Sequence, residues 1–140
     1  MKTFQEILKE ANHSVPAITP EEAKSLQDDG ALIIDIRELE EIQISGKVKG
    51  SYHIPRGLLE FQTKLVNPNG LEGFDTENTV ILYCASGGRA ALAGKALKDL
   101  GFEKVFSLGG LMDWLVAELP VEEILFKISS FHNHQLQNQG

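Results

Sequence analysis

The sequence has a single cysteine, Cys84, among its 140 residues, so no disulfide can form within one chain. A chain without disulfides suits a reducing compartment, and we therefore expect a cytoplasmic protein. Long apolar runs are also lacking, since no segment approaches the roughly 20 residues of a membrane span. The N-terminus carries Glu6 and Glu10 and so lacks the uninterrupted apolar stretch of a signal peptide. We expect no membrane partner.

Positive charge is scarce, because 13 Lys and Arg stand against 20 Asp and Glu, which gives a net charge of -7. Such a charge repels a polyphosphate backbone at long range, and no basic run offsets it, so we expect no nucleic-acid partner. Metal-ligand patterns are weak as well. His132 and His134 form an H-x-H pair without a cysteine or acidic cluster nearby, and we expect solvated tail residues and no metal site.

The remaining composition is ordinary, with 42% hydrophobic and 24% charged residues, and its patterning predicts an α/β fold. Short apolar runs predict buried strands at residues 31–37, 80–83 and 104–108. Helical patterns are found at residues 20–30, 90–100 and 111–117. Thr19 and Glu22 form a capping box at the start of the first of these helices. Strands that alternate with helices predict a mainly parallel central sheet flanked by helices.

Cys84 lies between a predicted strand and a predicted helix, in the segment VILYCASGGRA at residues 80–90. The thiolate is the nucleophile in sulfur chemistry, and a helix N-terminus offers unpaired N–H groups and a positive dipole end that stabilise an anion. Gly87 and Gly88 allow backbone conformations in which successive N–H groups point inward as an anion nest. Arg89 adds a permanent cation for loop carbonyls or an incoming anion. An isolated cysteine is most often a core residue, but this combination favours a reactive site.

Two charged residues, Asp35 and Arg37, follow another apolar run, at the strand ends where active groups gather in parallel sheets. We expect them to lie near Cys84 in a supporting role. The spacing of Arg37 and Glu41 predicts an i,i+4 ion pair at the strand exit. His53 is expected to be a hydrogen-bonded structural residue rather than a base. A core-facing helical stripe is predicted for Leu111, Trp114 and Leu115.

Five segments resemble those of a known family. CASGGR, residues 84–89, resembles the active-site loop of rhodanese-like sulfurtransferases, C-x-x-G-x-R after a buried strand. IIDIRELEE at 33–41 matches the family's D-x-R-x-x-x-E segment, GKVKGS at 46–51 resembles its G-H-I-x-G-A stretch, and HIPRG at 53–57 is similar to what usually follows. VFSLGGLMDW at 105–114 is similar to its closing V-x-x-L-x-G-G-x-x-x-W. The resemblance implies a rhodanese-like three-layer domain over residues 17–117.

The sequences on either side of that domain predict added elements. Residues 1–16 predict an N-terminal helical extension that is amphipathic over residues 3–11. Residues 118–140 predict a further helix past Pro120 and then a frayed polar tail. We expect both flanks either to pack together as an added layer or to form a dimer surface, so monomer and homodimer stay open. The apolar residues expected to contribute from the C-terminal side are Val121, Ile124, Leu125 and Ile128.

The resemblance implies a sulfurtransferase with Cys84 as the catalytic nucleophile and without a cofactor. Cys84 would take the outer sulfur of a small donor, thiosulfate or a persulfide, and pass it from a Cys84 persulfide to cyanide or to a small or protein thiol. The backbone N–H groups expected to bind the persulfide belong to Ala85, Ser86, Gly87, Gly88 and Arg89. Lys47 replaces the family's usual histidine and is not expected to be catalytic. Ala85 and Gly88 are neutral where thiosulfate-preferring members often carry cationic or polar residues, which favours an uncharged persulfide-type donor or protein-bound sulfur.

Two alternatives remain beside sulfur transfer. Related phosphatases place five residues between cysteine and arginine, whereas four separate Cys84 from Arg89. Those phosphatases also have histidine where Tyr83 precedes the cysteine, so sulfur transfer is favoured over phosphatase chemistry. The other alternative is a rhodanese-like binding or regulatory module without turnover, which the intact cysteine loop disfavours.

Overall fold

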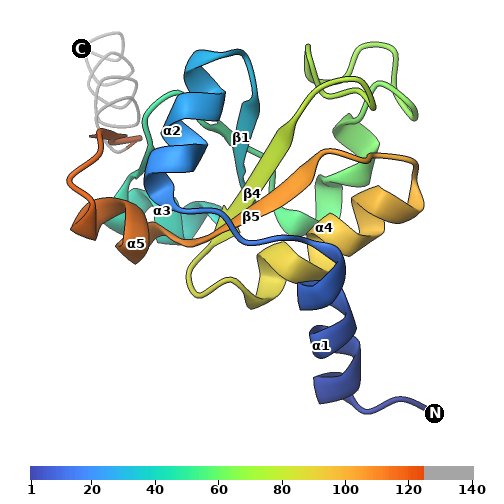
Figure 1. The fold of residues 1–140 in the computed structure, drawn as a ribbon. Helices are drawn as coiled ribbons and strands as arrows, with labels where there is room; N and C mark the ends of the chain where they lie inside the picture. The colour runs from blue at the N-terminus through green and yellow to red at the C-terminus, as the bar shows by residue number, and fades with distance from the viewer. Residues whose placement is uncertain (125–140) are drawn as a thin grey trace, which may run out of the picture.

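The computed structural model describes residues 1–124, which form a four-stranded sheet with helices on both faces (Figure 1). The strand order is β3-β1-β4-β5, and every neighbouring pair is parallel. The strands of this sheet are β1 (Leu32–Asp35), β3 (Tyr52–His53), β4 (Val80–Cys84) and β5 (Val105–Gly110). The predicted α/β fold with a mainly parallel central sheet is therefore confirmed.

Among the described residues, four α-helices form where the capping and apolar patterns predict them, and a fifth, at residues 39–45, was not predicted. The capping box of Thr19 and Glu22 is present at the start of the second helix, with Glu22 N–H donating to Thr19 Oγ1 at 3.1 Å. The α-helices are α1 (Phe4–Ser14), α2 (Pro20–Asp28), α3 (Leu39–Ser45), α4 (Gly88–Asp99) and α5 (Leu111–Val116). Two 3₁₀ helices, η1 (Arg56–Leu58) and η2 (Glu60–Gln62), follow β3. Within residues 1–124 there is no helix with the length and apolar character to cross a membrane.

Side chains alternate along β4 between two core clusters, one on each face of the sheet. Val80, Leu82 and Cys84 belong to the cluster on the α4 side, whereas Ile81 and Tyr83 belong to the cluster under α2 and α5. This double burial explains why the strand is an uninterrupted apolar run. Each fully buried aliphatic side chain contributes roughly 1.5–3 kcal/mol relative to exposure.

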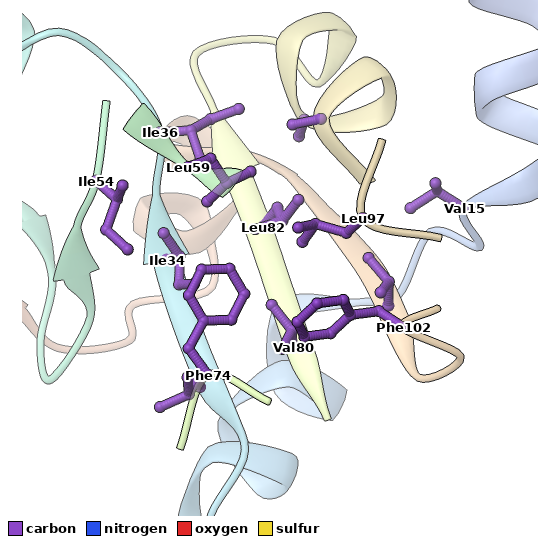
Figure 2. Close-up of a cluster of buried hydrophobic side chains, with 14 of the residues drawn as sticks. Val15, Ile34, Ile36, Ile54, Leu59, Phe74, Val80, Leu82, Leu97 and Phe102 are labelled. Carbon is purple, nitrogen blue, oxygen red and sulfur yellow. The ribbon is translucent and has the colours of Figure 1, made fainter. Parts of the chain in front are cut away.

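Figure 2 shows the cluster on the α4 side, where side chains of β1 and β4 meet Leu97 of α4. Phe74 and Phe102 close one end of it, with ring centroids 5.4 Å apart. On the opposite face Trp114 is fully buried and Leu111 nearly so, as predicted. Leu115 is 38% exposed, so its predicted core position is wrong. It lies about 100° further round the short helix α5 than Trp114, which already fills the inward face.

The chain past Pro120 differs from the prediction. Val121–Glu122 forms a short strand, β6, paired antiparallel with β2 (Lys47–Val48), so the expected helix is wrong at these residues. The backbone of Pro120 is already bound, because its carbonyl accepts from Lys49 N–H at 3.0 Å and from Trp114 Nε1 at 2.8 Å. These bonds hold the chain extended beside β2. The predictions made for Leu125, Ile128, His132 and His134 concern residues outside the described range.

The N-terminal helix is present and packs against α4 (Figure 1). Val15, 2% exposed, reaches the core, and Gly94 leaves it room, since a Cβ there would lie 2.8 Å from a Val15 methyl. The residues after α1 extend the sheet edge: Ser107 N–H donates to the Pro16 carbonyl and Ile18 N–H to the Ser107 carbonyl, both at 2.9 Å. Of the two arrangements expected for the flanks, the packing of this helix against Val121 is wrong, because β6 lies on the opposite side of the molecule (Figure 1).

Candidate active site

The candidate site lies where β4 ends and α4 begins. Cys84 is the last residue of β4, at the carboxyl edge of the central strands, and Gly88 is the first residue of α4. The thiol is 1% exposed and lies on the α4 side of the sheet. The loop between them therefore joins a rigid, doubly buried strand to the N-terminus of a helix of 12 residues.

The cysteine loop, defined as residues 84–89, directs a backbone donor at the sulfur. Gly87 has φ of +101°, in the left-handed region, and its N–H donates to Cys84 Sγ at 3.0 Å. Gly88 does not share that conformation, so the expected freedom is used at one glycine and not at both. The first N–H groups of α4 have no acceptor within the helix, which leaves them directed into the loop.

The end of β5 supports the loop from behind. Gly110 is paired with Cys84, and a Cβ at Gly110 would lie 1.9 Å from the Ala85 carbonyl oxygen. Gly109 has φ of +89° and lies in contact with Gly87. A Cβ added at Gly87 would be 3.5 Å from the Cα of Gly109. No local pattern in the sequence connects the two β5 glycines with the cysteine. The sequence does contain a signal for this contact: a glycine pair ends the strand that follows the cysteine strand along the chain.

Arg89 is held by a carboxylate from α3. Its guanidinium donates to the two Glu41 carboxylate oxygens at 2.7 and 2.9 Å. The hydrogen bond from Arg89 lowers the pKa of Glu41 to about 2, while that bond and, to a smaller degree, Cys84 raise the pKa of Arg89. The predicted Arg37–Glu41 pair is wrong. Arg37 precedes α3, whose N-cap is Glu38, so the i,i+4 spacing of a helix does not apply between them.

Asp35, the last residue of β1, and Arg37, two residues beyond it, form a buried ion pair. Arg37 donates to Asp35 from Nε at 3.0 Å and from a terminal nitrogen at 2.7 Å, and Asp35 is completely buried. Burial alone would lower the pKa of Arg37, but the hydrogen bond and charge of Asp35 raise it. Arg37 also lies 5.8 Å from the ring centroid of Tyr83, the residue before Cys84.

Further contacts of this pair fix the surrounding loops. Arg37 donates to Ser45 Oγ at 2.9 Å and to the Gly46 carbonyl at 2.8 Å, both at the end of α3. His53 Nε2 lies 2.7 Å from the Arg37 carbonyl oxygen, the structural hydrogen bond that was predicted. Tyr83 Oη accepts from Val48 N–H at 2.9 Å, and burial, reinforced by the charge of Asp35, raises the pKa of Tyr83. The ion pair thus connects β1 to the elements around the cysteine strand.

Lys47 is engaged in structural contacts. Its ammonium binds the Ser51 carbonyl and the Glu122 carboxylate, which ties β2 to β6. Within residues 1–124 no cluster of three or more His, Cys, Asp or Glu side chains is arranged to hold a metal ion. The chemistry available at the candidate site is that of a thiol in a loop of backbone donors, with a guanidinium fixed at its far end.

Comparisons with known proteins agree with this geometry. The Rhodanese-like domain pattern matches residues 19–117. Thiosulfate sulfurtransferase GlpE of Haemophilus influenzae (strain PittEE) is 31% identical over 111 residues, which cover 78% of this chain and 96% of GlpE. YrkF of Bacillus subtilis (strain 168), a sulfur carrier protein by its provisional name, is 32% identical over 104 residues. That match covers 72% of this chain and 51% of YrkF, so the chain spans about half the length of this relative.

Two solved structures are similar over most of the chain. The polysulfide-sulfur transferase homodimer of Wolinella succinogenes has a TM-score of 0.69 and 33% identity, with 86% of this chain and 87% of that one covered. A Rhodopseudomonas palustris protein described as a possible tyrosine phosphatase has a TM-score of 0.76 and 35% identity, with coverage of 87% and 96%. Since the family pattern spans most of the chain and includes the whole cysteine loop, the protein belongs to the rhodanese-like domain family.

Proposed function

We propose that this protein is a rhodanese-type sulfurtransferase that carries sulfane sulfur on Cys84. The observation that carries the proposal is the loop itself: four residues separate Cys84 from Arg89, and Gly87 N–H donates to Cys84 Sγ at 3.0 Å. Relatives named as thiosulfate and polysulfide-sulfur transferases support the same reaction class. We further propose that residues 17–117 form the catalytic domain and, from the single cysteine, that the protein is cytoplasmic.

The reaction proceeds in two displacements on sulfur. In the first, the Cys84 thiolate attacks the outer sulfur of the donor; a new S–S bond forms and the donor's S–S bond breaks. With thiosulfate the leaving group is sulfite, which departs with the electron pair. In the second, an acceptor thiolate or cyanide attacks the outer sulfur of the Cys84 persulfide. The Cys84–S bond breaks and Cys84 is released as the thiolate, so the cycle needs no external oxidant or cofactor.

The loop would stabilise the anion by backbone donors and by its fixed shape. Gly87 N–H already donates to Cys84 Sγ, and the remaining N–H groups of residues 85–89 would bind the outer sulfur of the persulfide. A preorganised donor costs no rearrangement when charge moves from Sγ to the outer sulfur. Gly110 holds the loop from behind and the Glu41–Arg89 pair holds its end. Asp35 and Arg37 act indirectly, through the strand and loop contacts that position Tyr83 and Cys84.

The charge distribution favours an uncharged persulfide-type donor or protein-bound sulfur over thiosulfate. Ala85, Gly87 and Gly88 carry no cation, and the Arg89 guanidinium is already neutralised by Glu41 with two hydrogen bonds. A dianion such as thiosulfate would have to compete with Glu41 for that cation. A donor with less charge at its far end avoids this competition.

Phosphatase chemistry is the alternative suggested by the Rhodopseudomonas palustris relative. A loop with four intervening residues is one residue shorter than the phosphatase loop described above, and fewer backbone donors are then available for a phosphate group. Glu41 also accepts from both terminal nitrogens of the Arg89 guanidinium, the pair of donors that would bind phosphate oxygens. Sulfur transfer is therefore the function that the geometry supports better.

The experiment combines sulfur loading with turnover. Wild-type protein and Cys84→Ser are incubated separately with thiosulfate, glutathione persulfide and polysulfide, and intact mass is measured before and after addition of cyanide. We expect a one-sulfur adduct on the wild type alone, removed by cyanide as thiocyanate. A binding module without turnover would instead show no transfer to any acceptor, together with a stable protein complex that Cys84→Ser leaves intact.

A further inference from the structure

A groove of about 500 Å³ lies between the N-terminal helix and the cysteine loop. We refer to it as the α1–loop groove. Its lining includes Leu8 and Asn12 of α1, Ser86, Gly87 and Gly88 of the loop, and Ser107 of β5. Its volume is within the range that small-molecule sites occupy, about 300–1,000 Å³. Gly87, whose N–H contacts Cys84 Sγ, forms part of its wall, so a ligand here would lie beside the sulfur-binding backbone.

The α1 wall of the groove is firmly attached to the domain. Val15 is inserted between α4 and β5, against Gly94. The next residues continue the sheet edge by the two backbone bonds with Ser107, each 2.9 Å long. Leu8 and Asn12 are therefore held beside the loop by core packing and by β-type hydrogen bonds. These residues precede the family match, which begins at residue 19, so the wall is an addition to the shared domain.

The groove lining carries no charged side chain among the residues that the structure describes. Its polar groups are neutral: the exposed Asn12 amide, which has no hydrogen-bond partner within residues 1–124, the exposed Ser86 hydroxyl and loop backbone. Half-buried Leu8 supplies an apolar surface. A site of this kind favours an uncharged organic body that can hydrogen-bond to an amide, because no side chain of the lining can form an ion pair with a charged one.

We propose that the α1–loop groove binds the body of a small, uncharged organic thiol that accepts sulfur from Cys84, with Asn12 and Leu8 as specificity-determining residues. This inference rests on the proposed sulfurtransferase function. The acceptor thiolate forms an S–S bond with the outer sulfur of the persulfide, the Cys84–S bond breaks, and the electron pair returns to Cys84. The product is the persulfide of the acceptor. Cyanide is too small to fill the groove and undergoes the same transfer without using it.

The test compares two acceptors that differ by one charge, N-acetylcysteine and its methyl ester, with cyanide as a third. Because the two half-reactions are separate, kcat/KM for the acceptor reports on the second one alone. Asn12→Lys is expected to raise the N-acetylcysteine-to-ester ratio of kcat/KM roughly fivefold, since a nearby cation attracts the carboxylate with about 1 kcal/mol. Leu8→Trp, which fills the groove, is expected to lower kcat/KM for both thiols roughly tenfold and leave cyanide within about twofold.

The matched control is Asn69→Lys, which makes the same charge change at an exposed asparagine that does not line the groove. It should leave the ratio at the wild-type value. A kcat/KM ratio that is unchanged in Asn12→Lys, or that changes equally in Asn69→Lys, overturns the inference. Because Asn12 is exposed, Asn12→Lys tests the inference even if Leu8→Trp fails to fold. Failure of the proposed function looks different: no donor then gives a sulfur adduct on the wild-type protein.

Discussion

The contact between Gly110 and the cysteine loop gives the sharpest structural prediction. A Cβ added at Gly110 would lie 1.9 Å from the Ala85 carbonyl oxygen and 2.7 Å from its carbonyl carbon. These are backbone atoms, so no side-chain rotation relieves the overlap, and the loop must move by roughly 1 Å to restore an ordinary contact. A 1 Å displacement of positioning groups costs about 10²-fold in rate. Gly110→Ala should therefore lower kcat/KM about a hundredfold, which corresponds to about 2.7 kcal/mol.

The assay is thiocyanate formation from cyanide with a saturating sulfur donor, together with the thermal unfolding midpoint. Gly57→Ala is the matched control, because a Cβ at Gly57 meets nothing within 4 Å and its φ is outside the left-handed region. It should keep the wild-type kcat/KM. A Gly110→Ala protein that unfolds cooperatively and retains the wild-type rate would refute the argument that β5 positions the loop.

Three further variants test the contacts around the site. Glu41 has its pKa lowered from 4.5 to about 2, so its contribution to stability is present above pH 4.5 and lost as the pH falls toward 2. Glu41→Gln weakens the contact with Arg89 and should therefore be less stable than wild type by under about 1 kcal/mol above pH 4.5. In urea unfolding, the stabilities of the two proteins should converge near pH 2. A stability difference that stays constant with pH would contradict this. Asp35→Asn should lower the free energy of unfolding by about 3 kcal/mol, because it leaves a buried guanidinium without its counter-ion; a loss below about 1 kcal/mol would disprove that role. Gly94→Ala should lower the free energy of unfolding by about 1–3 kcal/mol, because the added methyl group crowds Val15. Adding Val15→Ala to this variant should recover part of that loss. Effects of the two substitutions that simply add in thermal unfolding would argue against the contact.

The sequence predicts the sheet well because the information is local. Val80 to Tyr83 is buried on both faces, and such strands need continuous apolar residues regardless of their neighbours. The capping box before α2 is likewise contained within a few residues. The position of Cys84 at the carboxyl end of β4 follows from the same pattern.

Contacts between distant segments were harder to predict. Glu41 was assigned to Arg37 by sequence spacing, although it binds Arg89, 48 residues away, because α3 begins only after Arg37. The support of the loop by Gly110 depends on the order of β4 and β5 in the sheet and on how closely they approach. The strand at Val121 required knowledge that the backbone of β2 was available for pairing.

The central claim, that Cys84 carries sulfur as a persulfide, is tested most directly by intact-mass measurement of the wild type and Cys84→Ser after exposure to a sulfur donor. The account predicts a gain of one sulfur atom on the wild type, none on Cys84→Ser, and its loss when cyanide is added. No adduct with thiosulfate, glutathione persulfide or polysulfide, or an adduct that survives Cys84→Ser, would contradict it.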